Sequence, residues 1–185
     1  MYGNVLFVCD ILRAFADLQQ QGVVILSSQK RIKIYDILHH DNLSLIRLSL
    51  VENNCLKNLF DQLERKEIKI KFFASHQERD DVLQLAFCVE RSALKTAQNI
   101  LYQLSLKDED IHVNAEAGMV AIYGPHFVEQ YGIIDNMHNT LSSQGVSVLA
   151  ISTTISSSFF VIPASEVVRA VDILNEAFEI PKGKV

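Results

Sequence analysis

The sequence lacks tryptophan and contains only three prolines and seven glycines among its 185 residues. With so few residues that interrupt regular backbone, we expect most of the chain to lie in helices and strands. Basic charge is also scarce, because 17 Lys and Arg stand against 22 Asp and Glu, for a formal net charge of −5. A nucleic-acid partner requires a clustered excess of Lys and Arg. The lysines of residues 66–71 alternate with apolar residues, which predicts the solvent face of a strand and no such cluster.

Cysteine is rare as well, and its spacing excludes the usual metal and disulfide motifs. Cys9, Cys55 and Cys88 are far apart, odd in number and form no CxxC pair, so we expect reduced thiols in a cytoplasmic protein. No apolar run reaches the roughly 20 residues that cross a bilayer. The first residues carry no basic leader before their short apolar run, so we expect no signal peptide and no membrane partner.

What the sequence does contain is an internal repeat. Residues 59–73 and 137–151 share a helix–turn–strand pattern, in which Leu63 and Ile68 correspond to Leu141 and Val146. Because 49% of the residues are hydrophobic, each copy can contribute to a substantial core.

A second block repeats after the first. Residues 86–101 and 159–174 each begin as a buried strand, reach a serine, and continue as an amphipathic helix. Ser92 and Ser165 are the predicted N-caps, because a serine hydroxyl can accept from the free amides of a first helical turn. An apolar strand precedes each unit, at Leu43–Val51 and Gly118–Gly124.

The resulting order of elements predicts the fold class. Strand, helix, strand, strand and helix, completed by one further strand, describe a ferredoxin-like βαββαβ unit. We therefore predict an α+β protein with two such domains, each an antiparallel four-stranded sheet with its helices on one face.

Residues 151–163, ISTTISSSFFVIP, concentrate hydroxyl side chains between two apolar segments. A serine nucleophile needs a base and an oxyanion hole, and neither a GxSxG nor an SxxK motif is present. The apolar flanks also argue against a linker. We predict two neighbouring antiparallel strands joined by a turn, and no catalytic residue in the chain.

These same segments resemble the regulatory region of the aspartokinase family. LSSQGVSVLAISTT, residues 141–154, resembles the family's helix end, glycine turn and IST strand. RAVDILNEAFEIP, residues 169–181, resembles its closing helix. Residues 35–51 resemble, more faintly, the linking strand and first strand of the other ACT domain in that family.

The resemblance implies a domain organisation. ACT domain 1 would span residues 41–107, and ACT domain 2 would combine residues 30–40 with residues 112–182. The two would interlock, because the strand before the first unit joins the sheet of the second. Residues 1–29 would be an N-terminal extension or a remnant of a kinase domain.

The resemblance also implies a function. Such a module senses a free amino acid, lysine or threonine, and acts as a homodimer through its ACT sheets, alone or with a separate kinase subunit. The phosphate loop of a kinase domain is missing, and no GxGxxG or GxxxxGK(S/T) motif replaces it. We therefore expect no enzyme activity from this chain alone, and no cofactor or metal.

By resemblance, the amino-acid site would lie between strand–helix loops of adjacent ACT domains. Nearly every side chain that the family uses there is replaced: Val51 stands for its Asp, and Ser147 for its partner Asn. Backbone amides at the helix start could still bind a carboxylate. The predicted ligand-binding residues are Val51, Glu52, Asn53, Asn54, Cys55, Ser75, His76, Ser147 and Val148.

The resemblance places intersubunit contacts in the second unit. The predicted interface residues are Gly124, His126, Gly132, Ser152, Thr153 and Thr154. The histidines show no HxxxH or HxH spacing, so we interpret them as surface residues. The replaced side chains leave one alternative open, a structural dimerisation module whose ligand pocket has decayed. An enzyme completed by residues 1–29 is the other, and no triad, carboxylate pair or metal cluster supports it.

Overall fold

The computed structural model describes residues 31–50, 53–77, 82–104, 106–124 and 132–181. The predicted extension 1–29, together with Val51, Glu52 and His126 among the predicted site residues, lies outside this part of the chain.

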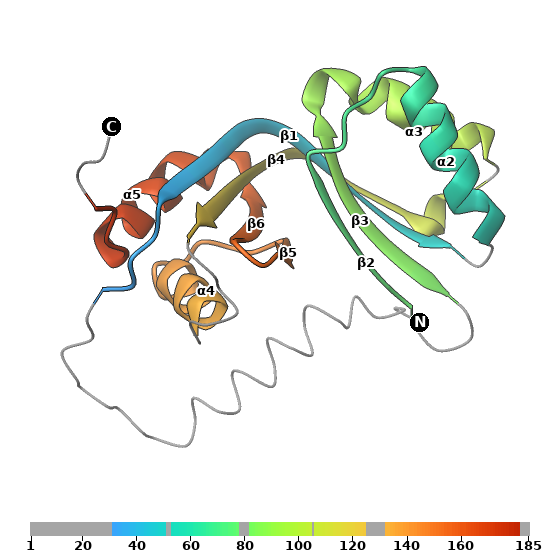
Figure 1. The fold of residues 1–185 in the computed structure, drawn as a ribbon. Coiled ribbons are helices and arrows are strands. Elements are labelled where there is room, and N and C mark those ends of the chain that lie inside the picture. The colour runs from blue at the N-terminus through green and yellow to red at the C-terminus, as the bar shows by residue number, and fades with distance from the viewer. Residues whose placement is uncertain (1–30, 51–52, 78–81, 105, 125–131, 182–185) are drawn as a thin grey trace.

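One antiparallel sheet organises the structure (Figure 1). Its strands follow the order β2-β3-β1-β4-β6-β5. In chain order the strands are β1 (Asp36–Leu50), β2 (Phe72–Gln77), β3 (Leu83–Glu90), β4 (Ile111–Tyr123), β5 (Ala150–Thr153) and β6 (Ser157–Pro163). The helices are α2 (Asn53–Arg65), α3 (Leu94–Gln103), α4 (Ile133–Ser143) and α5 (Val167–Ala177). The α+β class and the antiparallel sheet agree with the prediction, whereas two four-stranded sheets are replaced by one six-stranded sheet.

The single sheet arises because β1 and β4 are longer than the sequence predicted. The start of β1, residues 36–40, pairs with residues 119–123 at the end of β4. Residues 43–50 pair with β3 on one side, and residues 43–48 pair with the first half of β4 on the other. Residues 36–40 thus join the sheet beside the end of β4, and residue 33 forms a separate bridge to residue 179.

An irregularity marks the middle of the two long strands. The register between β1 and β4 shifts twice between His40 and Leu45. At this place the buried Ser44 hydroxyl donates to the carbonyl of Ala115 over 2.7 Å. This hydrogen bond satisfies a polar group that would otherwise be costly to bury.

The helices form two layers, one over each half of the sheet (Figure 1). Under α4 and α5, residues such as Val120, Phe160 and Leu174 form one buried apolar cluster. Under α2 and α3, residues such as Leu48 and Phe87 form a second. This amphipathic packing follows from helix faces that repeat apolar residues every three or four positions.

A third cluster lies between the two halves. It joins Phe72 of β2, Cys88 of β3, Met119 of β4 and Ala150 of β5, all buried. The sheet bends enough to bring its two edge strands, β2 and β5, into proximity. The two helix layers consequently lie on the outside and the bent sheet between them (Figure 1).

The predicted serine caps are wrong. Ser92 and Ser165 are the central residues of short 3₁₀ turns, Arg91–Ala93 and Ala164–Glu166, and neither turn has a side-chain cap. The chain tightens directly after β3 and β6, and α3 and α5 continue from these turns. Both serines therefore lie within the 3₁₀ turns. They are not the residues directly before α3 and α5, where an N-cap would lie.

The hydroxyl-rich segment is confirmed as two strands and a turn. β5 pairs with β6 from Ala150↔Val161 to Thr153↔Ser158. In the turn, the Thr154 hydroxyl accepts from the amide of Ser157 over 3.0 Å. The hydroxyls here form turn and strand hydrogen bonds, consistent with the absence of a nucleophile motif.

Candidate functional site

The predicted ligand loop leads into the first turn of α2. Asn53 and Asn54 begin this helix. Cys55 is half-buried and packs against the cluster under α2 and α3. Its thiol therefore serves packing, and the backbone amides at the helix start are the groups of this loop that favour an anion.

The two predicted residues on β2 point in opposite directions. Side chains alternate along a strand, and Phe73 is on the side of α2, since its ring centroid lies 5.8 Å from that of Phe60. Ser75, exposed, shares this side. His76 lies on the other, where Phe72 and Ala74 join the third cluster. The structure thus places Ser75, but not His76, on the side of β2 that faces the start of α2.

The predicted residues of the second unit lie just before β5. Ser147 is exposed, whereas Val148 packs against the cluster under α4 and α5. Although β2 and β5 approach each other, no hydrogen bond within the described ranges joins Ser75 to Ser147. The predicted ligand residues therefore come from both halves of the chain, whose edge strands approach each other.

The predicted interface residues are mixed in exposure. Gly124 is buried, and its amide donates to the carbonyl of Ser156 over 2.9 Å. Gly132 begins α4 in a left-handed conformation, with φ of 81°. Ser152 is half-buried, and Thr153 and Thr154 are exposed. Thr153 and Thr154 are thus open to a partner, whereas Gly124 holds the turn next to them.

Burial shields one of the described cysteine thiols. Burial raises the pKa of the Cys88 thiol to about 12, so this thiol remains protonated and unreactive. Across the described residues, no three His, Cys, Asp or Glu side chains lie close enough to hold a metal ion. None of the helices in those same residues is long and apolar enough to cross a membrane.

One cavity was not anticipated. A hollow of about 340 Å³ opens between the turn after α2 and the start of α3, with Lys66, Glu67, Glu90 and Thr96 in its lining. The alternating pattern of residues 66–71 predicts a strand, but β2 begins only at Phe72. A signal was available in the repeat, since Thr96 occupies the position of the much longer Arg169.

Comparison with known proteins identifies the class of domain. Residues 120–178 match the family model of the ACT domain. This segment contains the second half of β4, α4, β5, β6 and α5, which are the elements over which the sequence resembles that family most closely. The match to the ACT domain family therefore concerns this segment of the chain.

The particular resemblance is to aspartate kinase. Aspartokinase 2 of Bacillus subtilis (strain 168) is 24% identical over 129 residues, which cover 69% of this chain and 31% of that protein. The chain thus spans about a third of the length of this curated relative. The suspected relationship to the regulatory region of aspartokinase is confirmed at this level.

Solved structures share the fold. The ligand-free regulatory subunit of aspartate kinase from Thermus thermophilus matches with a TM-score of 0.69 and 17% identity, over 79% of this chain and 99% of that one. Aspartokinase III of E. coli, in complex with lysine and aspartate (T-state), matches with a TM-score of 0.59 and 15% identity, over 83% of this chain and 35% of that one.

Proposed function

We propose that this chain is a non-catalytic regulatory module of the aspartate kinase type, which binds a free amino acid, lysine or threonine, in feedback control of aspartate-family amino-acid biosynthesis. The observation that carries the proposal is the match to an isolated regulatory subunit over 99% of that subunit's length. The part of an aspartate kinase that this chain resembles is thus its regulatory part.

Lysine is the first ligand to test. The E. coli aspartokinase III structure was solved with lysine and aspartate. In this chain the start of α2 supplies backbone amides for an α-carboxylate, and Ser75 lies on the same side of β2 as α2. As the resemblance implies for adjacent ACT domains, the proposed site is completed by a second copy in a homodimer.

The sheet offers a strand edge at which a second copy of the chain could pair. Within the part of the chain that the structure describes, residues 36–40 of β1 pair only with β4, because pairing with β3 begins at Leu43. Polar residues in and beside this part of β1, including His39, His40 and Asp41, are exposed. Strand edges with unpaired amides and carbonyls are suited to pairing with another chain. Regulation then follows if the amino acid binds one arrangement of the two chains better than another.

The second candidate is a structural dimerisation module without an effector. Its support is specific, since His76 points away from the α2 side of β2 and Val51 and Ser147 replace polar family residues. Titration calorimetry with lysine, threonine and the other amino acids separates the two candidates. Heat of binding with lysine or threonine, at a stoichiometry of one ligand per chain, supports sensing, and silence with both leaves the structural module.

A variant locates the site. Ser75→Arg would place a long cation beside α2 and should reduce lysine or threonine affinity at least about tenfold, or about 1.4 kcal/mol. Asn99→Arg adds the same charge to an exposed position of α3 and is the control. Equal binding by both variants would remove this site from the proposal.

Two further experiments test the rest of the proposal. Sedimentation equilibrium tests the dimer, and an aspartate kinase assay of the chain should be negative.

A further inference from the structure

The two halves of the molecule build the same turn after α2 and α4. Glu67 and Gly145 both have positive φ, 54° and 75°. The amide of Ile68 donates to Leu63, and that of Val146 donates to Leu141, each over 3.0 Å. These hydrogen bonds close equivalent helix ends, so the two sites can be compared residue by residue.

In the second half, an arginine fills the space beside this turn. Arg169 is the third residue of α5, and its guanidinium donates to the carbonyl of Gln144 at the end of α4. It also forms an ion pair with Glu166 over 3.2 Å. A Cβ added at Gly145 would lie 3.9 Å from its Nη2 atom. The end of a helix, with its unpaired carbonyls, stabilises such a cation.

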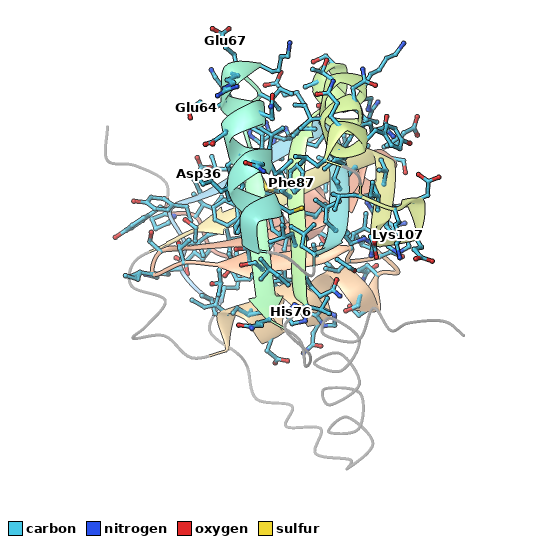
Figure 2. All side chains as sticks on the ribbon, turned by 90° about the vertical axis from the view of Figure 1, so that its right-hand side faces the viewer. Asp36, Glu64, Glu67, His76, Phe87 and Lys107 are labelled. Carbon is cyan, nitrogen blue, oxygen red and sulfur yellow. The ribbon has the colours of Figure 1, made fainter. Side chains whose placement is uncertain are left out.

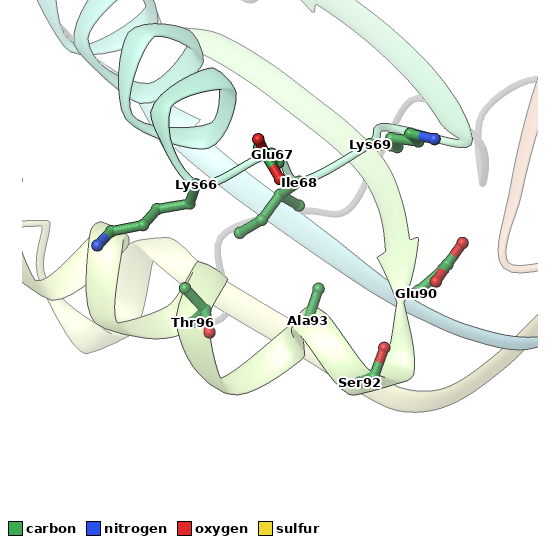
Figure 3. Close-up of a pocket in the computed structure, with 8 residues that line it drawn as sticks. All are labelled: Lys66, Glu67, Ile68, Lys69, Glu90, Ser92, Ala93 and Thr96. Carbon is green, nitrogen blue, oxygen red and sulfur yellow. The ribbon is translucent and has the colours of Figure 1, made fainter.

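In the first half, the same place is hollow. Thr96 is the third residue of α3 and Ala93 precedes that helix, so both the arginine and its carboxylate partner are replaced by short side chains. A cavity of about 340 Å³ results (Figure 3). Its volume falls within the roughly 300–1,000 Å³ of small-molecule sites.

The cavity is lined by charges of both signs. Lys66 and Lys69 contribute two cations, and Glu67 and Glu90 two carboxylates, while Lys71 outside the lining pairs with Glu90 over 3.2 Å. Ser92 adds a hydroxyl at the turn that leads into α3. A rim with both signs complements a ligand that itself carries both signs.

We infer that this cavity binds a free amino acid with a guanidinium side chain. The guanidinium takes the place that Arg169 fills in the other half, donating to the carbonyl of Lys66 and facing the carboxylate of Glu67. At the rim, the lysines attract the α-carboxylate of the ligand, and Glu90 attracts its α-ammonium. A planar guanidinium offers several donors in a fixed geometry, which suits a helix end and a carboxylate together.

This cavity is separate from the site proposed above. Figure 2 shows Glu67 and His76 at opposite ends of the half that contains α2 and β2. α2 runs towards Glu67, and β2 then returns towards Ser75 and His76. A ligand at one end therefore does not touch the other, and loss of one site leaves the other testable.

Titration calorimetry of the whole chain with arginine and with citrulline tests the inference. Citrulline has nearly the same shape but a neutral ureido group, so arginine should bind at least about tenfold more tightly, or about 1.4 kcal/mol. Thr96→Arg rebuilds the arginine of the second half and should abolish the heat of arginine binding. Asn99→Arg, with the same added charge outside the cavity, should bind arginine as the unmodified chain does.

A second variant covers failure of the first to fold. Glu67→Gln keeps the size of the side chain and removes its charge, and should weaken arginine binding about tenfold. The inference is overturned if arginine does not bind or if citrulline binds equally well. Unchanged arginine binding by folded Thr96→Arg, or by Glu67→Gln, overturns it too. The Ser75→Arg variant should retain arginine binding whether or not it loses lysine or threonine.

Discussion

Glu67 and Gly145 hold the same left-handed position at the turns after α2 and α4, with φ of 54° and 75°. Glycine adopts this conformation without cost, whereas a residue with a Cβ does so at roughly 1–2 kcal/mol. Glu67→Gly should therefore raise the free energy of unfolding by about 1 kcal/mol. Urea denaturation measures the change.

Glu64→Gly is the matched control for this variant. Glu64 is exposed in the last turn of α2, where glycine should lower stability by about 1 kcal/mol. Two variants that lose the same side chain should thus shift the midpoint in opposite directions. A decrease for both would show that the turn after α2 is not strained by Glu67.

Gly118 lies in the sheet where a side chain has no room. A Cβ there would lie 2.3 Å from Cγ2 of Val167 and 2.9 Å from the carbonyl oxygen of His40. The second of these atoms belongs to the backbone of β1, so it cannot move aside easily. Gly118→Ala should lower the free energy of unfolding by about 1–3 kcal/mol, measured by chemical denaturation.

Gly132 provides the contrast to Gly118. A Cβ there meets nothing within 4 Å, but its φ is 81°. Gly132→Ala should therefore cost only the backbone strain, about 1 kcal/mol. If Gly118→Ala were the milder of the two substitutions, the close contact between β4, β1 and the start of α5 would be absent in solution.

Arg169 closes the end of α4, and its removal should open a space like that beside α2. Its side chain is half-exposed, so the ion pair with Glu166 contributes little and the hydrogen bond to Gln144 somewhat more. Arg169→Thr should lower stability by about 1 kcal/mol or less. Glu166→Ala removes only the ion pair and should have the smaller effect in the same thermal melts.

Cys88 should resist thiol reagents. Its pKa is raised to about 12 by burial, so at a pH of about 8 it carries almost no thiolate. Iodoacetamide labelling followed by peptide mass spectrometry should modify Cys55 before Cys88, which reacts only after denaturation. Modification of Cys88 in the native protein at the rate of Cys55 would contradict its burial.

The same pKa implies a pH dependence. Between the ordinary pKa of 9.0 and about 12, the folded protein keeps the Cys88 proton while the unfolded chain releases it. The folded state binds more protons in this window, so the contribution of Cys88 to stability is present below pH 9.0 and is lost as the pH rises through the window. Cys88→Ala should flatten this part of the profile in denaturation measured against pH.

Much of the fold could be predicted because apolar residues follow regular periods. The strand before α2, the second half of β4 and the helices α3 and α5 all carry such patterns. The first part of β1 does not, since His39, His40 and Asp41 are exposed and polar. Its pairing with β4 is non-local, and only a family resemblance indicated it. Periodicity therefore could not show that two strands would join both halves into one sheet.

The candidate sites were harder to predict. Side chains alternate along β2, so Ser75 and His76 point to opposite faces of the sheet. Which of the two faces α2 depends on where the strand begins, at Phe72, and sequence patterns locate strand starts only approximately. The cavity beside Glu67 exists because the side chains around it are short. Sequence motifs are defined by the side chains that are present, so no motif predicts such a cavity. Only the mismatch between Thr96 and Arg169 in the repeat carried that information.

The length of β4 has a consequence for synthesis on the ribosome. Residues 43–50 of β1 pair with β3 and also with Ile111 and its neighbours in β4, so the first helical layer lacks its fourth strand until translation passes β4. A nascent chain of about 110 residues exposes this strand edge until the 13 residues of β4 are added, which takes about 1–3 s at roughly 5–20 residues per second. The protein is thus expected to need protection from edge-to-edge association mainly while its second half is being made.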